Sequence, residues 1–462
     1  MSLFRRLRAV VALASVLPLA ACTGTPADDD ADQSDEALSF TGTPNDDIGQ
    51  FFMIEHFGVD AGGFADVHNM IKRQNLGALI LWNPTQASGE TARQMVTRYA
   101  TTAHESRHAE LFVAADQEES GTQRFKSRNG FTDLASAATL GRVAAAQGNA
   151  RVCELHARIT SREMSAAGMN MTLGTVSDVF TKNSGTPGMF RTRSIGADSA
   201  VVTSCIAAMT KAYGAEKHVV FITKHFPGLG NASGNTDVDP SVRTFSTTKE
   251  RMEEELAPYR AATASVNGDD TWPVFGAMIS HASYEILDAS KSPATLSPVI
   301  LEGLLRGSAA TELEATGVDA AKKPVAFKGM GLKGLTVSDA FWTWGATKNL
   351  TPVEKRRLMA QSFASGMDIL MIAKAEFLGA WDYFQQIMAA QLPEAEAQAL
   401  AAAAHEPSFA AFQAKFKTRV AESAARIKAA KTAVGPAASF MGHGEARAAS
   451  TELVAEYKRL TQ

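Results

Sequence analysis

The sequence VVFITKHFPG, residues 219–228, joins a short apolar run to a polar turn. The run Val219–Thr223 is short and rich in β-branched and aromatic side chains, which predicts a buried strand. A helical pattern over Ser199–Tyr213 precedes it, and Lys224 and His225 follow it directly. This order predicts a unit of a parallel α/β sheet that carries ionisable groups at the carboxyl end of its strand.

The same alternation of short apolar runs with helical patterns extends along the chain. Eight runs predict strands: Gln50–His56, Ala78–Trp82, Leu111–Ala115, Met169–Leu173, Val219–Thr223, Phe275–Ser280, Leu335–Ser338 and Asp368–Ile372. The helical patterns include Gly63–Gln74, Ala150–Ala167, Ser199–Tyr213, Ser297–Arg306 and Pro352–Ser365. Eight strand–helix units predict an α/β fold, a single (β/α)8 barrel of the TIM type. A doubly wound sheet usually has fewer strands and a glycine-rich phosphate turn, and no such turn follows the first run.

Two further segments lie outside the eight units. Glu314–Gly331 interrupts the pattern before the seventh strand and is expected to be an inserted loop. Ala-rich helical sequence from Glu376 to Val434 follows the last strand and predicts a C-terminal helical extension. We therefore expect a barrel domain with a helical cap over residues 44–435, followed by a helical tail over residues 436–462.

The composition of the chain excludes several classes of protein. Its 462 residues are 45% hydrophobic and 20% charged, which is typical of a folded globular chain. Lys and Arg number 45 against 49 Asp and Glu, a net charge of −4, and without a basic excess we expect no nucleic-acid partner. No apolar run of about 20 residues follows the N-terminus, so a polytopic membrane protein is excluded.

The first residues are typical of a targeting segment. Residues 1–21 have a basic head, an apolar stretch from Ala9 to Ala20 and small residues at the end, which predicts a secretory signal peptide. The Cys22 that follows makes the stretch resemble a bacterial lipobox, which implies cleavage before Cys22 and a diacylglycerol on its sulfur. An ordinary signal peptide with an incidental cysteine is the alternative. Residues 22–43 are rich in Asp and predict a solvated, disordered tether. The folded part is therefore expected outside the cytoplasm, held at the membrane only by a lipid.

Two cysteines remain in the mature chain. Cys153 and Cys205 lie in helical patterns that flank one predicted strand, so neighbouring helices could bring them together. An exported compartment permits a disulfide. Two buried free thiols are the alternative.

Ionisable residues stand at the carboxyl ends of four predicted strands. Asp116 follows the third strand, Lys224 and His225 the fifth, His281 the sixth and Asp339 the seventh. In a (β/α)8 barrel these ends gather at one rim, where the loops that carry catalytic groups meet. Any one of these residues could be a helix cap or a structural ion pair, but together they predict an active site.

Several motifs resemble glycoside hydrolase family 3, and most closely its single-domain bacterial β-N-acetylglucosaminidases. The similarity extends from about Ile48 to Lys431, and the motifs that carry it are Asp116-Gln117-Glu118, Gln123-Arg124-Phe125, Ser177-Asp178-Val179, Arg193-Ser194-Ile195-Gly196, Lys224-His225-Phe226-Pro227-Gly228, Met278-Ile279-Ser280-His281 and Val337-Ser338-Asp339. The resemblance implies a (β/α)8 barrel and retaining hydrolysis of terminal β-N-acetylglucosamine, often from peptidoglycan fragments. It implies no cofactor, and the sequence has no HExxH-type or Cys/His cluster for a metal.

The resemblance also assigns roles to individual residues. Asp339 matches the nucleophile, whose carboxylate attacks the anomeric carbon and holds a covalent glycosyl intermediate. Ligands of sugar hydroxyls are matched by Asp116, Arg124, Arg193, Lys224 and His225. Charged donors and acceptors of this kind discriminate strongly between hydroxyl patterns. A core histidine that orients Asp116 or Lys224 is the alternative for His225.

The sequence departs from the family where the general acid should be. In the family a loop after KHFPG ends in Asp-Ser-His, and its His is the acid/base; here Asp239 matches the Asp, but Ser241 stands in the place of the His. A hydroxyl cannot replace imidazole as a general acid. Asp237 or Asp239 could then be the acid, the substrate could have a leaving group that needs no proton, or the protein could bind glycan without cleaving it.

We expect an exported, lipid-anchored, monomeric glycosidase that acts on β-linked amino sugars of the cell envelope. A catalytically weak glycan-binding lipoprotein is the alternative. A solute-binding lipoprotein would share the anchor but would show two α/β lobes, which the strand pattern does not predict.

Overall fold

The computed structural model describes residues 47–82, 87–118, 122–180, 192–435 and 443–462. The predicted signal peptide, Cys22 and the acidic tether lie outside these residues, as does the start of the predicted barrel domain at residue 44.

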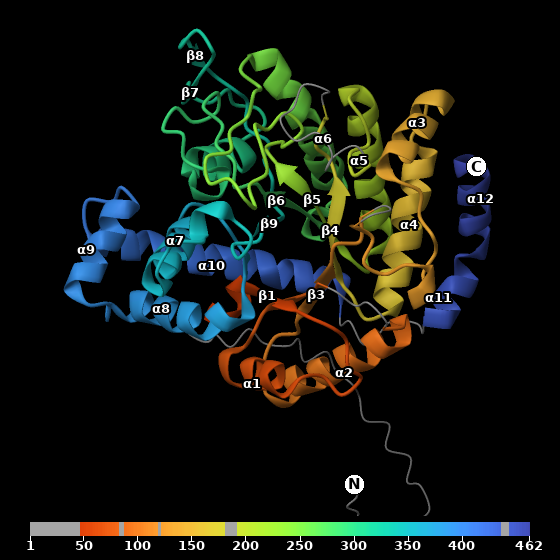
Figure 1. The fold of residues 1–462 in the computed structure, drawn as a ribbon, viewed down its shortest axis with the longest axis horizontal. Coiled ribbons are helices and arrows are strands. Elements are labelled where there is room, and N and C mark those ends of the chain that lie inside the picture. The colour runs from red at the N-terminus through yellow and green to blue at the C-terminus, as the bar shows by residue number, and fades with distance from the viewer. Residues whose placement is uncertain (1–46, 83–86, 119–121, 181–191, 436–442) are drawn as a thin grey trace, which may run out of the picture. The chain divides into compact units, whose positions relative to one another are not determined.

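Eight parallel strands form the centre of the molecule (Figure 1). They are β1 (Phe52–His56), β2 (Ala78–Leu81), β3 (Phe112–Ala115), β4 (Met171–Val176), β5 (Val220–Phe226), β6 (Phe275–Ile279), β9 (Leu335–Ser338) and β10 (Leu370–Ile372). The order in the sheet is β10-β1-β2-β3-β4-β5-β6-β9, and the two ends meet because the backbone N–H of Ser338 donates to Ile369, 2.9 Å away. The predicted (β/α)8 barrel and all eight strands are confirmed, with ends that move by one to three residues.

Helices follow each strand and cover the outside of the barrel. They are α1 (Ala65–Gln74), α2 (Gly89–Glu105), α3 (Ala137–Gln147), α4 (Arg151–Ala166), α5 (Ser199–Glu216), α6 (Lys249–Gly268), α7 (Pro352–Ala364) and α8 (Phe377–Ala389). The start of α7 illustrates the local signals, because Thr351 and Glu354 form a capping box around Pro352 in the first turn. The helical pattern over Ser297–Arg306 becomes a π-helix, Val299–Leu305, rather than an α-helix.

The C-terminal helices close and buttress the barrel. They are α9 (Glu394–Ala403), α10 (Phe409–Val434), α11 (His443–Ala449) and α12 (Thr451–Thr461). In α10 the Lys431 ammonium donates to the carbonyl oxygens of Gly77, at 3.1 Å, and Glu110, which precede β2 and β3, so this helix closes the amino-terminal end of the barrel. Buried Asp368 binds Arg426 of the same helix at 2.9 Å. The site must therefore open at the opposite, carboxyl end.

The inserted segment and the cysteines are also resolved by the structure. The expected loop Glu314–Gly331 contains a small antiparallel pair, β7 (Gly317–Val318) and β8 (Pro324–Val325). Cys153 of α4 and Cys205 of α5 form a disulfide, which decides between the two alternatives that the sequence left open. Within the part of the chain that the structure describes, no helix is both long enough and apolar enough to span a membrane.

Candidate active site

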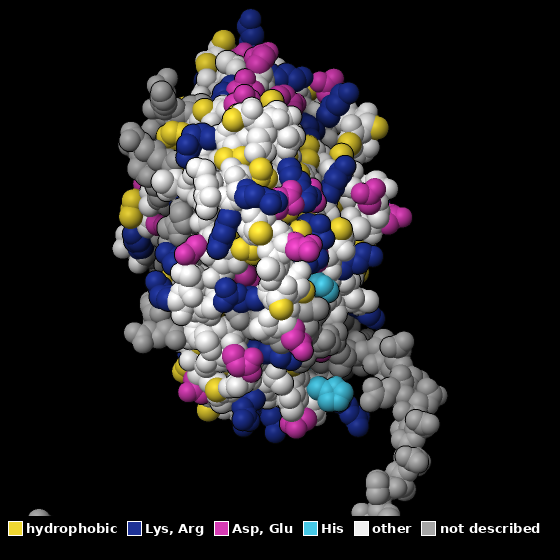
Figure 2. Space-filling view, turned by 90° about the vertical axis from the view of Figure 1, so that its right-hand side faces the viewer, with side chains coloured by type: hydrophobic (Ala, Val, Ile, Leu, Met, Phe, Trp, Pro, Cys, Tyr) yellow, Lys and Arg dark blue, Asp and Glu magenta, His cyan; other side chains and the backbone are white. Residues whose placement is uncertain are grey.

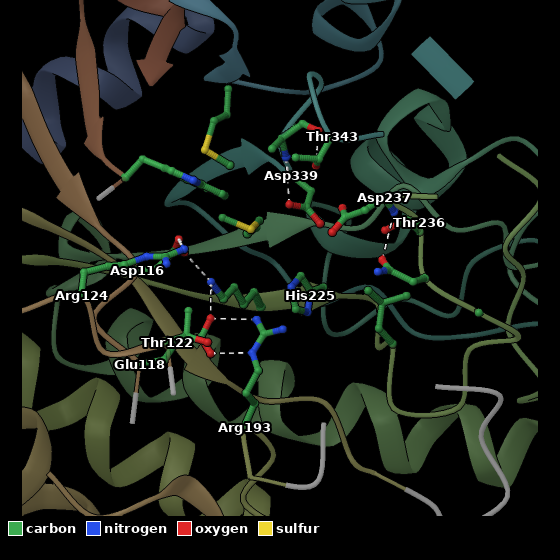
Figure 3. A pocket seen from close by; sticks show the side chains of 18 residues that line it. Asp116, Glu118, Thr122, Arg124, Arg193, His225, Thr236, Asp237, Asp339 and Thr343 are labelled. Carbon is green, nitrogen blue, oxygen red and sulfur yellow. Dashed lines mark hydrogen bonds and ion pairs between the residues drawn. The ribbon is translucent and has the colours of Figure 1, made fainter. Parts of the chain in front are cut away.

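A cavity of about 270 Å³ opens at the carboxyl end of the barrel (Figure 3). Its volume lies just below the ~300–1,000 Å³ of typical ligand pockets, which suits a ligand the size of one sugar ring. Strand ends supply most of its polar wall, and the loop Gly234–Asp237 supplies one side. Among the residues that line the cavity are seven of the eight predicted catalytic and sugar-binding residues: Asp116, Arg124, Arg193, Lys224, His225, Asp237 and Asp339.

Asp116 and Lys224 form an ion pair in the wall of this cavity. The Lys224 ammonium donates to Oδ1 of Asp116 at 2.7 Å, and the guanidinium of Arg124 donates to Oδ2 at 3.0 Å. Arg124 also lies over the ring of Trp82, 4.8 Å from its centroid, which fixes the plane of the guanidinium. The three charged groups present donors and acceptors in fixed directions, as recognition of a polyol requires.

Glu118 is a central residue that the sequence analysis did not select. Its fully buried carboxylate accepts two hydrogen bonds from Arg193, at 2.7 and 2.8 Å, and forms an ion pair with Lys224 at 2.7 Å. Burial alone would raise the pKa of Glu118, but Lys224 and Arg193 outweigh burial and hold this pKa well below its ordinary value. Its separation of two residues from Asp116, which places side chains on one side of an extended chain, was the available signal.

His225 is held by a second missed residue, Asp178. The ring Nδ1 lies 2.7 Å from Oδ2 of Asp178, and the backbone N–H groups of His225 and Leu229 donate to Oδ1 at 3.1 and 2.7 Å. Asp178 is completely buried just after β4, and it determines the orientation of the ring in the cavity wall.

Asp339 lies at the end of β9 and faces the cavity. Its Oδ1 accepts the backbone N–H of Ala340 at 2.8 Å. Burial by itself would raise the pKa of Asp339, but nearby His225 and the N–H of Ala340 help to hold it below its ordinary value. The carboxylate is thus ionised at neutral pH, which is the form that can act as a nucleophile.

The two aspartates of the loop after β5 lie in different surroundings. Asp237 lines the cavity, and its carboxyl points toward that of Asp339 in Figure 3. Burial raises the pKa of Asp237, and the negative charge of Asp339 raises it further. Asp239 is outside the cavity lining and instead accepts the N–H and the hydroxyl of Ser241, at 2.8 and 2.6 Å, and these bonds lower its pKa. The structure therefore brings Asp237, and not Asp239 or Ser241, to the site.

Groups of three or more metal-ligating side chains do not occur among the residues that the structure describes. The polar wall of the cavity is instead made of carboxylate–cation pairs, which can bind hydroxyls directly.

A family model described as "Glycosyl hydrolase family 3 N terminal domain" matches residues 44–405. The chain therefore belongs to glycosyl hydrolase family 3 and is a glycoside hydrolase by that membership. No protein of curated function matches the chain.

Solved structures of family members share the fold. A β-N-acetylglucosaminidase from Paenibacillus is 22% identical with a TM-score of 0.68, and the match covers 91% of this chain and 69% of that one. A β-N-acetylhexosaminidase from Beutenbergia cavernae is 23% identical with a TM-score of 0.60, over 83% of this chain and 98% of that one. A β-N-acetylglucosaminidase from Thermotoga maritima is 16% identical with a TM-score of 0.55, over 81% and 67%.

Because the ion pairs of Glu118 are buried, we expect its neutralisation to lower the free energy of unfolding strongly. Glu118→Gln leaves Lys224 and Arg193 without their shared carboxylate, and loss of one partner from a buried ion pair costs about 3–5 kcal/mol of unfolding free energy. Glu154→Gln, at the half-exposed pair with Arg151, is the matched control and should cost less than about 1 kcal/mol. Denaturant unfolding measures both.

The difference in unfolding free energy between wild type and Glu118→Gln should depend on pH in a defined direction. The pKa of Glu118 is lower in the folded protein than its ordinary value of 4.5. The contribution of Glu118 to the free energy of unfolding is therefore complete above pH 4.5, and it is lost as the pH falls through the pKa of the folded state. The gap between wild type and Glu118→Gln should therefore shrink below pH 4.5. A gap that widens with acid would contradict this assignment.

Proposed function

We propose that the protein hydrolyses terminal β-N-acetylhexosaminides with retention of configuration, in two steps through a glycosyl-enzyme intermediate. One observation carries this proposal: the carboxyls of Asp339 and Asp237, which have different electrostatic surroundings, point toward one another in a cavity lined by charged side chains. The activity of the related solved proteins, a β-N-acetylglucosaminidase and a β-N-acetylhexosaminidase, supports the choice of an N-acetylated amino sugar. The predicted export and anchor support β-linked amino sugars of the cell envelope as the source.

In the first step the sugar ring occupies the cavity. Asp116, Arg124 and Lys224 bind its hydroxyls, and His225 adds a ring N–H or nitrogen oriented by Asp178. The carboxylate of Asp339 attacks the anomeric carbon as the bond to the leaving oxygen breaks, and Asp237 gives that oxygen its proton. The products are the free leaving alcohol and an ester between Asp339 and the sugar, whose anomeric carbon now has the α configuration.

In the second step the roles of the two carboxyls reverse. Asp237, now ionised, accepts a proton from water, and the water oxygen attacks the anomeric carbon and displaces Asp339. A carboxyl that must be protonated once and ionised once in each turnover works best when its pKa lies near the operating pH. The raised pKa of Asp237 and the lowered pKa of Asp339 have the signs that these two roles require.

Substitution of the nucleophile tests the central assignment. Asp339→Asn should lower turnover of an aryl β-N-acetylglucosaminide by at least ~10⁴-fold, because the amide cannot form the glycosyl ester, while the sugar still binds. A slowly hydrolysed fluorinated glycoside should label the wild-type peptide that contains Asp339, as mass spectrometry would detect. If the wild type binds amino-sugar fragments but does not cleave even an activated aryl glycoside, the protein is a glycan-binding lipoprotein instead.

Substitution of the loop aspartates tests the general acid. Asp237→Asn should reduce kcat/KM for an alkyl glycoside by ~10²–10⁴-fold and for a dinitrophenyl glycoside far less, because an activated phenolate leaves without a proton. It should also remove the alkaline limb of the pH–rate profile of the wild type, which reports protonated Asp237. Asp239→Asn is the matched control in the same loop and should change neither substrate by more than a few-fold. Equal activity of wild type and Asp237→Asn on the alkyl glycoside would assign the acid elsewhere, with His225 as the next candidate.

We further propose that the chain is exported and anchored by a lipid on Cys22. The basic-apolar-small pattern of residues 1–22 supports this location. The disulfide between Cys153 and Cys205 supports it as well, because disulfides persist in oxidising compartments.

The anchor can be tested on the mature N-terminus. Wild type should begin at Cys22 with a diacylglycerol mass on its sulfur, whereas Cys22→Ala should carry no lipid and leave the membrane fraction. Mass spectrometry of the purified N-terminal peptide is the measurement. A wild-type protein cleaved elsewhere and free of lipid would refute the anchor and leave an ordinary signal peptide.

A further inference from the structure

The segment that follows the nucleophile is firmly attached to the barrel. We call residues Ala340–Thr347 the nucleophile loop. Its Phe341 donates a backbone hydrogen bond to Met371 of β10 at 3.0 Å. Its Trp344 is buried and stacks on His281 at the end of β6, with ring centroids 4.2 Å apart and planes 3° apart. Attachment to two strands makes this loop a rigid support.

The loop that carries Asp237 is a compact turn with its own internal bonds. We call residues Asn235–Ser241 the acid loop. Asn235 organises it, because its side-chain oxygen accepts the N–H of Asp237 at 2.9 Å and its backbone carbonyl accepts those of Val238 and Asp239 at 3.1 and 3.0 Å. The Asp239–Ser241 bonds complete the turn. The turn is self-contained, so its position over the cavity must be determined by what it packs against.

The acid loop packs against the nucleophile loop at Gly345. The N–H of Gly345 donates to the carbonyl of Thr236 at 2.8 Å, which is the one backbone hydrogen bond from residues 235–239 to another described segment. A Cβ on Gly345 would lie 3.0 Å from backbone atoms of Asp239 and Pro240. That separation is shorter than ordinary van der Waals contact, so the acid loop would have to move by a few tenths of an ångström.

Thr343 provides a second contact between the loops. Its hydroxyl donates to the carbonyl of Ala340 at 3.1 Å, and it lines the same cavity as Asp237 (Figure 3). Burial raises the pKa of Asp237, and the side chain of Thr343 opposes that rise, so its hydroxyl is within reach of the Asp237 carboxyl. A hydroxyl has one proton and can rotate, so it can turn from Ala340 to donate to an ionised Asp237, or it can accept from a protonated Asp237 while it donates to Ala340. Thr343 can therefore hold Asp237 in both protonation states of the proposed cycle.

We propose that the nucleophile loop positions the general acid: Gly345 sets the distance between the acid loop and the nucleophile loop, and Thr343 orients the Asp237 carboxyl. This inference rests on the proposed role of Asp237. Asp339 directly precedes the nucleophile loop and Asp237 lies on the acid loop, so the contact between the two loops fixes the separation of acid and nucleophile. That separation decides whether the proton reaches the leaving oxygen. Gly345 and Thr343 are thus positioning residues.

The first test adds one methyl group at the contact. Gly345→Ala should lower kcat/KM for methyl β-N-acetylglucosaminide by ~10²-fold, because displacement of a catalytic group by a fraction of an ångström to 1 Å is costly. For the dinitrophenyl glycoside, which needs no acid, the loss should stay within a few-fold. Gly268→Ala, at the end of α6, is the matched control, since a Cβ there meets nothing within 4 Å, and it should leave both substrates unchanged. Equal losses on both substrates would mean general damage to the site and would overturn the proposal.

The second test removes or restores one hydroxyl. Thr343→Val should lower activity on the methyl glycoside by ~10-fold and shift the alkaline limb of the pH–rate profile, and Thr343→Ser should recover most of both. In an Asp237→Asn background the Thr343→Val effect should vanish, because both changes act through one carboxyl. If Asp237→Asn shows the leaving-group dependence and the Gly345 and Thr343 variants do not, this inference fails and the proposed function stands. If Asp237→Asn itself has no such dependence, the assignment of the acid fails first.

Discussion

The position of Lys224 between Asp116 and Glu118 is the interaction on which the site depends. The ammonium lies 2.7 Å from each carboxylate and is buried, so neither acid can be removed without leaving a charge without its partner in a medium of low dielectric constant. Through Glu118 the cluster reaches Arg193, and through Asp116 it reaches Arg124. One buried cation therefore joins the loops after β3 and β4 to β5 and gives this wall of the cavity its shape.

The two carboxyls proposed as nucleophile and general acid acquire different properties from their surroundings alone. Asp339 ends a strand, near His225 and bonded to a backbone N–H, and these neighbours favour its ionised form. Asp237 is largely buried on a loop, and burial together with the negative charge of Asp339 raises its pKa. Two identical side chains thus have pKa values shifted in opposite directions, as the proposed nucleophile and acid require, and the negative charge of Asp339 contributes to the raised pKa of Asp237.

The acid loop keeps a well-ordered turn although Ser241 replaces the histidine of the family motif. Ser241, at the place of the family's histidine, caps Asp239 with two hydrogen bonds and so stabilises the turn. The pair that resembles a remnant of the catalytic dyad has a structural role in this chain. Asp237, two residues earlier, lies on the cavity side of the same turn because the side chain and carbonyl of Asn235 fold the backbone around it. A carboxyl is therefore present in the cavity, although the histidine that serves as acid/base in the family is absent.

Local sequence determined the eight strands, the barrel and the positions of Asp116, Lys224, His225 and Asp339 at strand ends, because apolar alternation is a local signal and parallel strands place all their carboxyl ends at one rim. Three further features depended on tertiary contacts: the choice of Asp237 over Asp239, the partnership of Asp178 with His225, and the pairing of Cys153 with Cys205. Residues 237 and 239 share one irregular turn with no repeating pattern, so nothing local says which of them faces the cavity. Asp178 and His225 are 47 residues apart, and the two cysteines 52, and only the closed barrel brings such residues into contact.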